Sequence, residues 1–311
     1  MQGPGSAGII VGMRIAVTGA SGLIGSALVP LLERDGHLVV RLVRRQPTSP
    51  AEIPWDPAAR RLDPAHLAGV DAVIHLAGAG IGDKRWNAAR KAEILNSRVD
   101  GTTTVATAVA AADNGPATLI SASAIGWYGD TGDRAVDESQ PAGTGFLAET
   151  CLAWEAATAP ASEAGVRVAT MRTGLVLSRE GGLLKRLIPL FKAGLGGKVS
   201  SGRMWWSWIT LQDEVDAIRY LLNHDSIAGP VNVVAPNPVT NAEFTKALAA
   251  ALHRPAVFRA PSLGLRAWLG EFADEGVLVG QRVIPRVLSD AGFPWSHPDL
   301  DSGLTWAITH P

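Results

Sequence analysis

A glycine-rich stretch near the N-terminus carries the strongest chemical signal in this 311-residue sequence. It reads Thr18-Gly19-Ala20-Ser21-Gly22-Leu23-Ile24-Gly25. Apolar residues 15–17 before it predict a buried strand, and apolar residues at helical spacing over 23–34 predict a helix after it. At such a turn, glycines let backbone amides approach a pyrophosphate, whose charge the helix N-terminus favours. We therefore predict a dinucleotide site formed by Gly19, Ala20, Ser21, Gly22, Leu23, Ile24 and Gly25; the alternative is an ordinary strand-to-helix turn.

Two arginines, Arg44 and Arg45, follow the next predicted strand, over residues 38–43. They stand about 20 residues past the glycine stretch, where an acidic side chain would accept hydrogen bonds from an unmodified ribose. Guanidinium groups at this place suit a 2′-phosphate instead. We therefore expect the cofactor to be NADP(H). The alternative is that both arginines only solubilise the end of a strand.

Short apolar runs alternate with helical segments over the first half of the chain. Further strands are predicted at 72–76, 117–120 and 166–171, and helices at about 84–112 and 147–163. Strands joined by crossover helices form a parallel sheet covered on both faces. We expect an α/β fold: a Rossmann-type doubly wound parallel sheet with a smaller C-terminal α/β lobe. The predicted parts are an expression scar or disordered leader at 1–12, an NADP-binding core at 13–178 plus about 208–235, and a substrate lobe at about 179–207 and 236–311.

The composition excludes several other classes of protein. Lys and Arg number 28 against 29 Asp and Glu, a net charge of −1 that argues against a nucleic-acid partner. The single cysteine, Cys151, excludes an intrachain disulfide and a cysteine-built zinc site, and no spacing of His, Asp or Glu suggests a metal. No apolar run is long enough to predict a membrane span. We expect a cytoplasmic protein with neither a nucleic-acid nor a membrane partner.

Three further segments, together with the glycine stretch, resemble the extended short-chain dehydrogenase/reductases. Leu76-Ala77-Gly78 resembles the N-A-G motif of that superfamily, the segment 121–129 resembles its serine-tyrosine segment, and 172–177 resembles its R-x-x-x-V stretch. The resemblance implies that these segments lie along the cofactor. It adds the following candidate cofactor-binding residues: Leu76, Ala77, Gly78, Ser121, Ala122, Thr173, Gly174 and Leu175.

More narrowly, the chain resembles an epimerase/dehydratase-type subfamily that is often called cell-division-inhibitor-like. Arg85-Trp86, Ser207-Trp208-Ile209 and the segment 235–244 are among the motifs that carry this likeness, which runs from Met13 almost to the end. It implies a C-terminal domain whose role is undefined. By the same analogy, Arg98 would serve the cofactor phosphates, and Glu93 would hold Arg98 or a ribose hydroxyl; the alternative is an exposed pair on a helix.

The sequence departs from the superfamily at its catalytic pattern, Y-x-x-x-K. Leu147 falls at the tyrosine place and Cys151 at the lysine place, and neither can relay a proton or hold a ribose. Tyr128 is then the only plausible phenolic proton donor, although the matching tyrosine of the superfamily is usually structural or faces the substrate. Ser123 aligns with the serine that hydrogen-bonds a reacting carbonyl, although it could equally cap the end of a strand.

Other reactive residues have simpler interpretations. Cys151 is expected to be a small buried side chain rather than a nucleophile, and His75 a core residue within its strand. The aromatic segment 205–208 is either a wall against a planar substrate or core packing, with no preference between the two.

Two main functions remain open from the sequence. The first is an NADP(H)-dependent oxidoreductase or epimerase acting on a small, unidentified carbonyl or alcohol. The second is a catalytically idle NADPH-binding protein that regulates an interaction. A sugar-nucleotide epimerase or dehydratase is a weaker third possibility. We also expect a possible homodimer, as in the superfamily.

Overall fold

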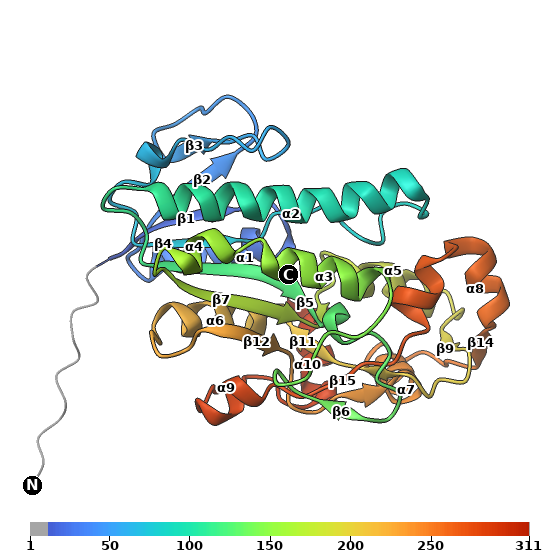
Figure 1. Cartoon of the computed structure of the whole chain (residues 1–311). Helices are drawn as coiled ribbons and strands as arrows, with labels where there is room; N and C mark the ends of the chain where they lie inside the picture. Colours follow the sequence, from blue (N-terminus) through green and yellow to red (C-terminus); the bar gives the residue numbers. More distant parts are fainter. Residues whose placement is uncertain (1–11, 311) are drawn as a thin grey trace, which may run out of the picture.

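Seven strands form one parallel sheet in the centre of the computed structural model, which describes residues 12–310 (Figure 1). Their order across the sheet is β12-β7-β5-β4-β1-β2-β3. The order reverses at β1, which is the signature of a doubly wound α/β fold, so the predicted fold class is confirmed. The strands are β1 (Arg14–Thr18), β2 (Leu38–Val43), β3 (Glu52–Pro54), β4 (Ala72–His75), β5 (Thr118–Ala124), β7 (Arg167–Thr173) and β12 (Gly229–Val233).

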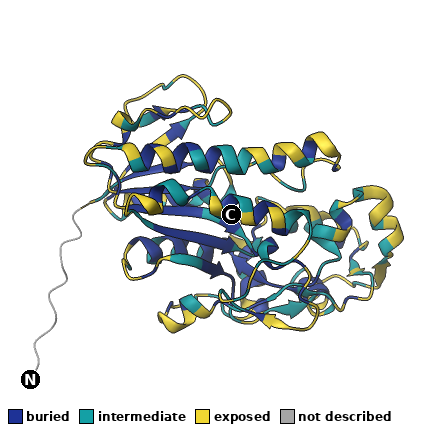
Figure 2. Cartoon of the chain, in the orientation of Figure 1, coloured by how far each residue is buried: buried dark blue, intermediate teal, exposed yellow. Residues whose placement is uncertain are grey.

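Alternate side chains of the central strand enter two different cores. Ile15 and Val17 pack with the helices α1 and α6 on one face of the sheet, whereas Ala16 packs with α2 on the other. Successive side chains of a strand point to opposite faces, so a strand buried on both sides must be apolar throughout. Figure 2 shows the sheet almost entirely buried between its helices. These helices are α1 (Leu23–Arg34) and α6 (Leu211–Leu222) on one face, and α2 (Ala88–Ala111), α3 (Phe146–Ala156) and α4 (Ala159–Glu163) on the other.

One predicted helix is divided in the structure. The sequence predicts a single helix over 147–163, but α3 ends at Ala156 and α4 begins at Ala159. Pro160 lies at the start of α4. Proline has no N–H and its ring clashes with the preceding turn, so it breaks a helix interior. In the first turn of a helix it is tolerated, because the N–H there would have no partner within the helix.

A third core, built largely by the C-terminal lobe, packs against one end of the sheet. Trp208, Phe244 and Leu304 are among its buried members. The short parallel pairing of β15 (Arg282–Val283) with β6 (Ala135–Val136) joins this lobe to the first half of the chain. A second short parallel pair is formed by β11 (Trp208–Thr210) and β8 (Leu175–Leu177). The lobe also contains α5 (Gly182–Lys192), β9 (Gly197–Val199), β10 (Trp205–Trp206), β13 (Val239–Thr240), α7 (Asn241–Ala251), β14 (Phe258–Ala260), α8 (Ser262–Leu269), η3 (Ala273–Val277), α9 (Arg286–Asp290) and α10 (Leu300–Thr309).

The remaining elements are two 3-10 turns, η1 (Pro64–Leu67) and η2 (Ile125–Tyr128). Between residues 12 and 310, no helix is both long enough and apolar enough to span a bilayer. The leader expected at 1–12 lies outside the described residues except for its last member.

Candidate dinucleotide site

The glycine stretch forms the turn between β1 and α1. Gly19 has φ +68°, and the Gly22 amide donates to the Gly19 carbonyl oxygen at 2.9 Å. A Cβ on Gly25 would lie 2.3 Å from that same oxygen, so the helix can approach the loop this closely only with glycine there. No side chain caps α1. The turn is thus a narrow backbone cradle at an uncapped helix N-terminus, which fits the pyrophosphate of a dinucleotide.

The hydroxyl of Thr18 ties this cradle to the loop after β4. It accepts hydrogen bonds from the amides of Leu76 and Ala77, at 3.0 and 3.2 Å, and lies 2.8 Å from His75 Nδ1. Since the oxygen already accepts from two N–H groups, its own hydrogen points to His75. His75 is fully buried, and burial lowers its pKa to about 4. The prediction that His75 is a core residue is confirmed, and the segment 76–78 lies beside the glycine cradle.

The two arginines after β2 have different surroundings. Arg45 forms a double hydrogen bond with Glu52, at 2.5 and 2.9 Å, and this pair holds the pKa of Glu52 at about 2. Arg44 is exposed, and it has no ion pair or side-chain hydrogen bond within residues 12–310. The guanidinium of Arg45 is thus engaged within its own loop, so of the two arginines Arg44 fits the predicted contact with a ribose phosphate better.

Arg98 points back from α2 to the loop after β4. Its Nη1 donates to the carbonyl oxygens of Ala79 and Ile94, at 2.9 and 3.1 Å, and its guanidinium stacks on Trp154. Glu93 does not hold it: that carboxylate is exposed and pairs with Arg90 at 2.6 Å. Residues 93 and 98 are five positions apart, so they leave the helix in different directions. The expected contact between Glu93 and Arg98 is wrong.

Ser123 ends β5 with its hydroxyl turned toward α3. The hydroxyl donates to Glu155 Oε1 at 2.6 Å, and Glu155 in turn forms two hydrogen bonds with Arg172, at 2.8 and 2.9 Å. All three side chains are largely buried. Because its hydrogen is already donated, Ser123 does not offer a donor to a substrate carbonyl in this arrangement. The expectation that its hydroxyl orients a reacting carbonyl stays a prediction, and this hydrogen bond does not favour it.

The hydroxyl of Tyr128 belongs to the same buried network. It donates to Asn232 Oδ1 at 2.7 Å and accepts from Arg172 Nη1 at 3.1 Å. The side chain is 4% exposed, and burial raises its pKa to about 12. A phenol that holds its proton this firmly and has no open face is a poor acid at neutral pH. The expectation that Tyr128 is the proton donor stays a prediction, which its burial and raised pKa disfavour.

The helix α3 presents no reactive side chain at the places of the missing tyrosine and lysine. Cys151 is buried, and burial raises the pKa of its thiol to about 12. The interpretation of Cys151 as a small buried side chain is confirmed. The amide of Leu147 donates to Glu275 Oε2 at 3.1 Å, and that of Phe146 to Oε1 at 3.2 Å. A residue of the C-terminal lobe thus caps the helix on which the resemblance placed the tyrosine and lysine positions.

The segment after β7 contains a second buried carboxyl group. Thr173 Oγ1 donates to Glu214 Oε1 at 2.8 Å, whereas Oε2 of Glu214 has no hydrogen-bond partner in the described part of the chain. Burial raises the pKa of Glu214 to about 8. Gly174 and Leu175 continue into backbone hydrogen bonds with Val233 and Ser207, which fix the course of this segment.

The aromatic segment 205–208 mostly packs inward. Trp206 and Trp208 are buried in the core of the C-terminal lobe, which confirms the core interpretation for these two residues. Trp205 is half-buried, and its Nε1 donates to Asp133 Oδ1 at 2.9 Å.

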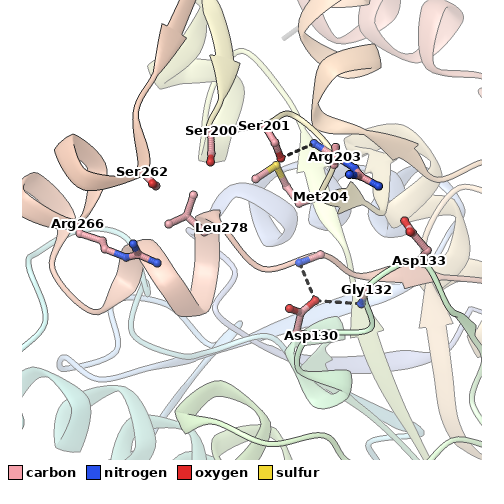
Figure 3. Close-up of a pocket in the computed structure, with 11 residues that line it drawn as sticks. Asp130, Gly132, Asp133, Ser200, Ser201, Arg203, Met204, Ser262, Arg266 and Leu278 are labelled. Carbon is pink, nitrogen blue, oxygen red and sulfur yellow. Dashed lines mark hydrogen bonds between the residues drawn. The ribbon is translucent and has the colours of Figure 1, made fainter.

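A polar pocket of about 430 Å³ lies between the loop that contains Asp130 and Asp133 and residues of the C-terminal lobe (Figure 3). Asp130 holds one wall in place by accepting from the amides of Gly132 and Gly280, at 3.0 and 3.3 Å. Arg203 and Arg266 bring positive charge to the rim. The other lining residues are Asp133, Ser200, Ser201, Met204, Ser262 and Leu278.

Sequence reasoning missed the partners that the tertiary structure supplies. Arg172 only began a motif, and Glu155, Glu214 and Glu275 were not singled out as site residues. A signal exists for two of them: Glu155 and Arg172 are charged residues at positions where apolar neighbours predict burial, and buried charges are usually paired.

Comparison with known proteins agrees with this arrangement. Residues 15–235 match the model of the NAD dependent epimerase/dehydratase family. The chain belongs to this family. Residues 260–307 match a domain of unknown function, DUF1731. The resemblance to the extended short-chain dehydrogenase/reductases is thereby confirmed.

Individual relatives match over nearly the whole chain. An epimerase family protein of Mycobacterium bovis is 49% identical over 297 residues, which cover 96% of this chain and 98% of that protein. The crystal structure of human epimerase family protein SDR39U1 with NADPH matches with a TM-score of 0.87 and 32% identity, over 96% of this chain and 100% of that one. A nucleoside-diphosphate sugar epimerase from Corynebacterium glutamicum matches with a TM-score of 0.78 and 38% identity, over 95% of this chain and 59% of that chain.

Proposed function

We propose that this member of the epimerase/dehydratase family binds NADP(H) and acts as an oxidoreductase or epimerase on a small carbonyl or alcohol. The observation that carries the proposal is the pairing of a glycine cradle with an exposed, unengaged Arg44, since a guanidinium there favours a 2′-phosphate. The human relative crystallised with NADPH supports the choice of cofactor.

Different segments of the chain would bind different parts of the cofactor. The amides of 19–25 would bind the pyrophosphate, Arg44 the 2′-phosphate, and the backbone of 173–175 would lie along the nicotinamide, as in the superfamily. Arg98 is positioned by Ala79 beside the loop 76–78, where it can add positive charge. NADPH supplies a hydride when bound.

Ser123 would act as an anchor within this scheme. Its hydroxyl holds Glu155, which holds Arg172, and together they fix the end of β5 against the end of β7. The ends of parallel strands at this edge of the sheet line the site in doubly wound folds. A substrate would therefore lie against a rigid surface. The proton that accompanies hydride transfer would come from solvent or from a group of the substrate itself.

A second function is favoured by one observation: the hydroxyls of Ser123 and Tyr128 are both engaged in buried hydrogen bonds. Leu147 and Cys151 offer no replacement for the missing tyrosine and lysine. In this second scheme the chain binds NADPH without turnover, and the occupied state regulates an interaction. A sugar-nucleotide epimerase is a weaker third candidate, supported by the name of the Corynebacterium relative.

Two measurements separate these functions. Calorimetric titration with NADPH and with NADH tests the cofactor, and we expect tighter binding of NADPH. The fluorescence of bound NADPH is then followed while a library of small aldehydes and ketones is added. Decay that depends on enzyme concentration supports the oxidoreductase, and binding without decay supports the idle protein. Equal binding of the two dinucleotides, or no binding of either, contradicts both the oxidoreductase and the idle NADPH-binding protein. Heat on titration with a UDP-sugar supports the sugar-nucleotide epimerase.

A further inference from the structure

Two stretches of the C-terminal lobe carry positive charge without negative charge. Residues 181–212 and 244–270 contain nine Lys and Arg and no Asp or Glu, in a chain whose net charge is −1. All nine cationic side chains are exposed. Only Arg186 and Arg266 have a carboxylate within 4 Å in the described structure, Asp83 at 3.6 Å and Asp274 at 2.8 Å. The other seven give these two stretches a positive charge that no ion pair compensates within the described residues.

The two stretches lie side by side. The strand β14 pairs with β9 in parallel. Arg254 Nε donates to the carbonyl oxygen of Lys192, at the end of α5, and Arg259 Nε donates to that of Ser200, at 3.4 and 2.6 Å. Figure 1 shows α5, β9, β14 and α8 together at one end of the molecule. The unpaired cations of 190–200 and of 253–268 therefore belong to one region of the surface.

Exposed apolar side chains lie among these cations. Within residues 12–310, six of the eight large exposed hydrophobic residues fall in 190–195 and 257–268, among them Trp268 at 73% and Leu263 at 77%. The helix α8 buries no residue, and Figure 2 shows it and β14 largely exposed at the edge of the molecule. We call this set the basic apolar surface: Leu190, Lys192, Leu195, Lys198, Arg254, Val257, Phe258, Arg259, Leu263 and Trp268.

We propose that the basic apolar surface binds an anionic lipid bilayer, with Trp268, Leu263 and Phe258 entering the interface. Exposed tryptophan and leucine next to Lys and Arg are the pattern of segments that lie in the plane of a membrane surface. The long cationic side chains can reach the headgroups while their stems cover apolar surface. The near-neutral total charge concealed this asymmetry, and the proposal therefore departs from the expectation of no membrane partner.

A protein partner fits these observations less well. Protein interfaces concentrate apolar side chains at a centre that is depleted of charge, whereas here Lys192, Lys198, Arg254 and Arg259 alternate with the apolar residues along the chain. A second copy meeting the same surface would place like charges opposite one another, which is repulsive. The proposal does not depend on the function proposed above.

Vesicle sedimentation tests the proposal on the full chain. We expect the protein to sediment with phosphatidylcholine vesicles containing about one-third phosphatidylglycerol, not with pure phosphatidylcholine, and to be released by high salt. The double variant Lys192→Glu/Trp268→Ala should lose at least about five-fold in binding.

A matched control exists on the opposite lobe. Arg34 stands in the last turn of α1 as Lys192 stands in the last turn of α5, and Leu38 is 60% exposed. Arg34→Glu/Leu38→Ala should bind vesicles like the original protein, and unfolding curves check that both variants fold. Three results would overturn the proposal: equal loss in both variants, binding to acidic poly-glutamate but not to vesicles, or a dimer in solution that only Lys192→Glu/Trp268→Ala dissociates.

Discussion

Glu155 and Arg172 join helix α3 to strand β7 by two parallel hydrogen bonds, at 2.8 and 2.9 Å. The side chain of Arg172 is 3% exposed, so almost no water reaches this ion pair. Arg172 also stacks on Trp127 and donates to Tyr128. The pair is thus the centre of the polar network at the end of the sheet.

Removing one member of this pair should be costly. Glu155→Gln leaves the Arg172 guanidinium buried without a counter-charge, and we expect the free energy of unfolding in urea to fall by about 3–5 kcal/mol. Glu33→Gln is the control, because the Glu33–Arg41 pair is about half exposed on both sides and should cost less than about 1 kcal/mol. Equal losses in the two variants would show that the burial of the first pair is unimportant.

Gly25→Ala should damage the dinucleotide cradle. The new Cβ would lie 2.3 Å from the Gly19 carbonyl oxygen, so α1 or the loop must move. We expect the Kd for NADPH to rise at least about ten-fold, which corresponds to about 1.4 kcal/mol. Gly264→Ala, whose Cβ would meet only Pro261 Cγ at 3.5 Å, should leave the Kd unchanged. Calorimetry decides between these outcomes.

Arg44→Ala should change the preference between the two coenzymes. Losing a charge-assisted hydrogen bond to the 2′-phosphate costs about 1.5–3 kcal/mol, so NADPH binding should weaken by roughly 10–100-fold while NADH binding stays the same. Arg45→Ala should leave the ratio of the two affinities nearly unchanged, because Arg45 is bound to Glu52. A larger effect at Arg45 than at Arg44 would reverse our assignment.

The stability of the protein should fall as the pH rises from about 6.5 to 8. Glu214 has a pKa of about 8 in the folded state against an ordinary 4.5, so in this window the folded chain keeps a proton that the unfolded chain has lost. Stability then declines by up to about 1.4 kcal/mol per pH unit. Urea unfolding of Glu214→Gln should show a much flatter profile.

Below about pH 6.5 a second buried group works in the opposite direction. Burial lowers the pKa of His75 from 6.5 to about 4, so stability due to this group is lost as the pH falls through that range. We therefore expect the decline caused by Glu214 to be visible mainly above pH 6.5. If the stability of Glu214→Gln falls just as steeply between pH 6.5 and 8, the decline is due to other groups.

Cys151 should be inert in the folded protein. Its thiol is 3% exposed, and its pKa is raised to about 12, so the thiolate that reacts with disulfide reagents is scarce. We expect an aromatic disulfide reagent to label the protein only after denaturation. Rapid labelling of the native protein would identify Cys151 as an accessible nucleophile.

The sequence by itself determined the features that depend on neighbours along the chain. Gly19, Gly22 and Gly25 lie close together along the chain, and their spacing between a predicted strand and a predicted helix predicted the cradle between β1 and α1. The apolar runs predicted the parallel sheet, because a strand buried on both faces must be apolar throughout. The missing tyrosine and lysine were also evident, since both places lie on one helix.

Only the tertiary structure decided which side chains are available for chemistry. Ser123, Glu155, Arg172 and Asn232 come from four separate elements and meet Tyr128 in one buried network. Glu275 reaches α3 from 128 residues further along the chain. Hydrogen bonds between such distant residues follow from how the elements pack, and no local spacing encodes them. The sequence therefore indicated where a cofactor would lie, and the packing showed that the expected hydroxyls are already engaged.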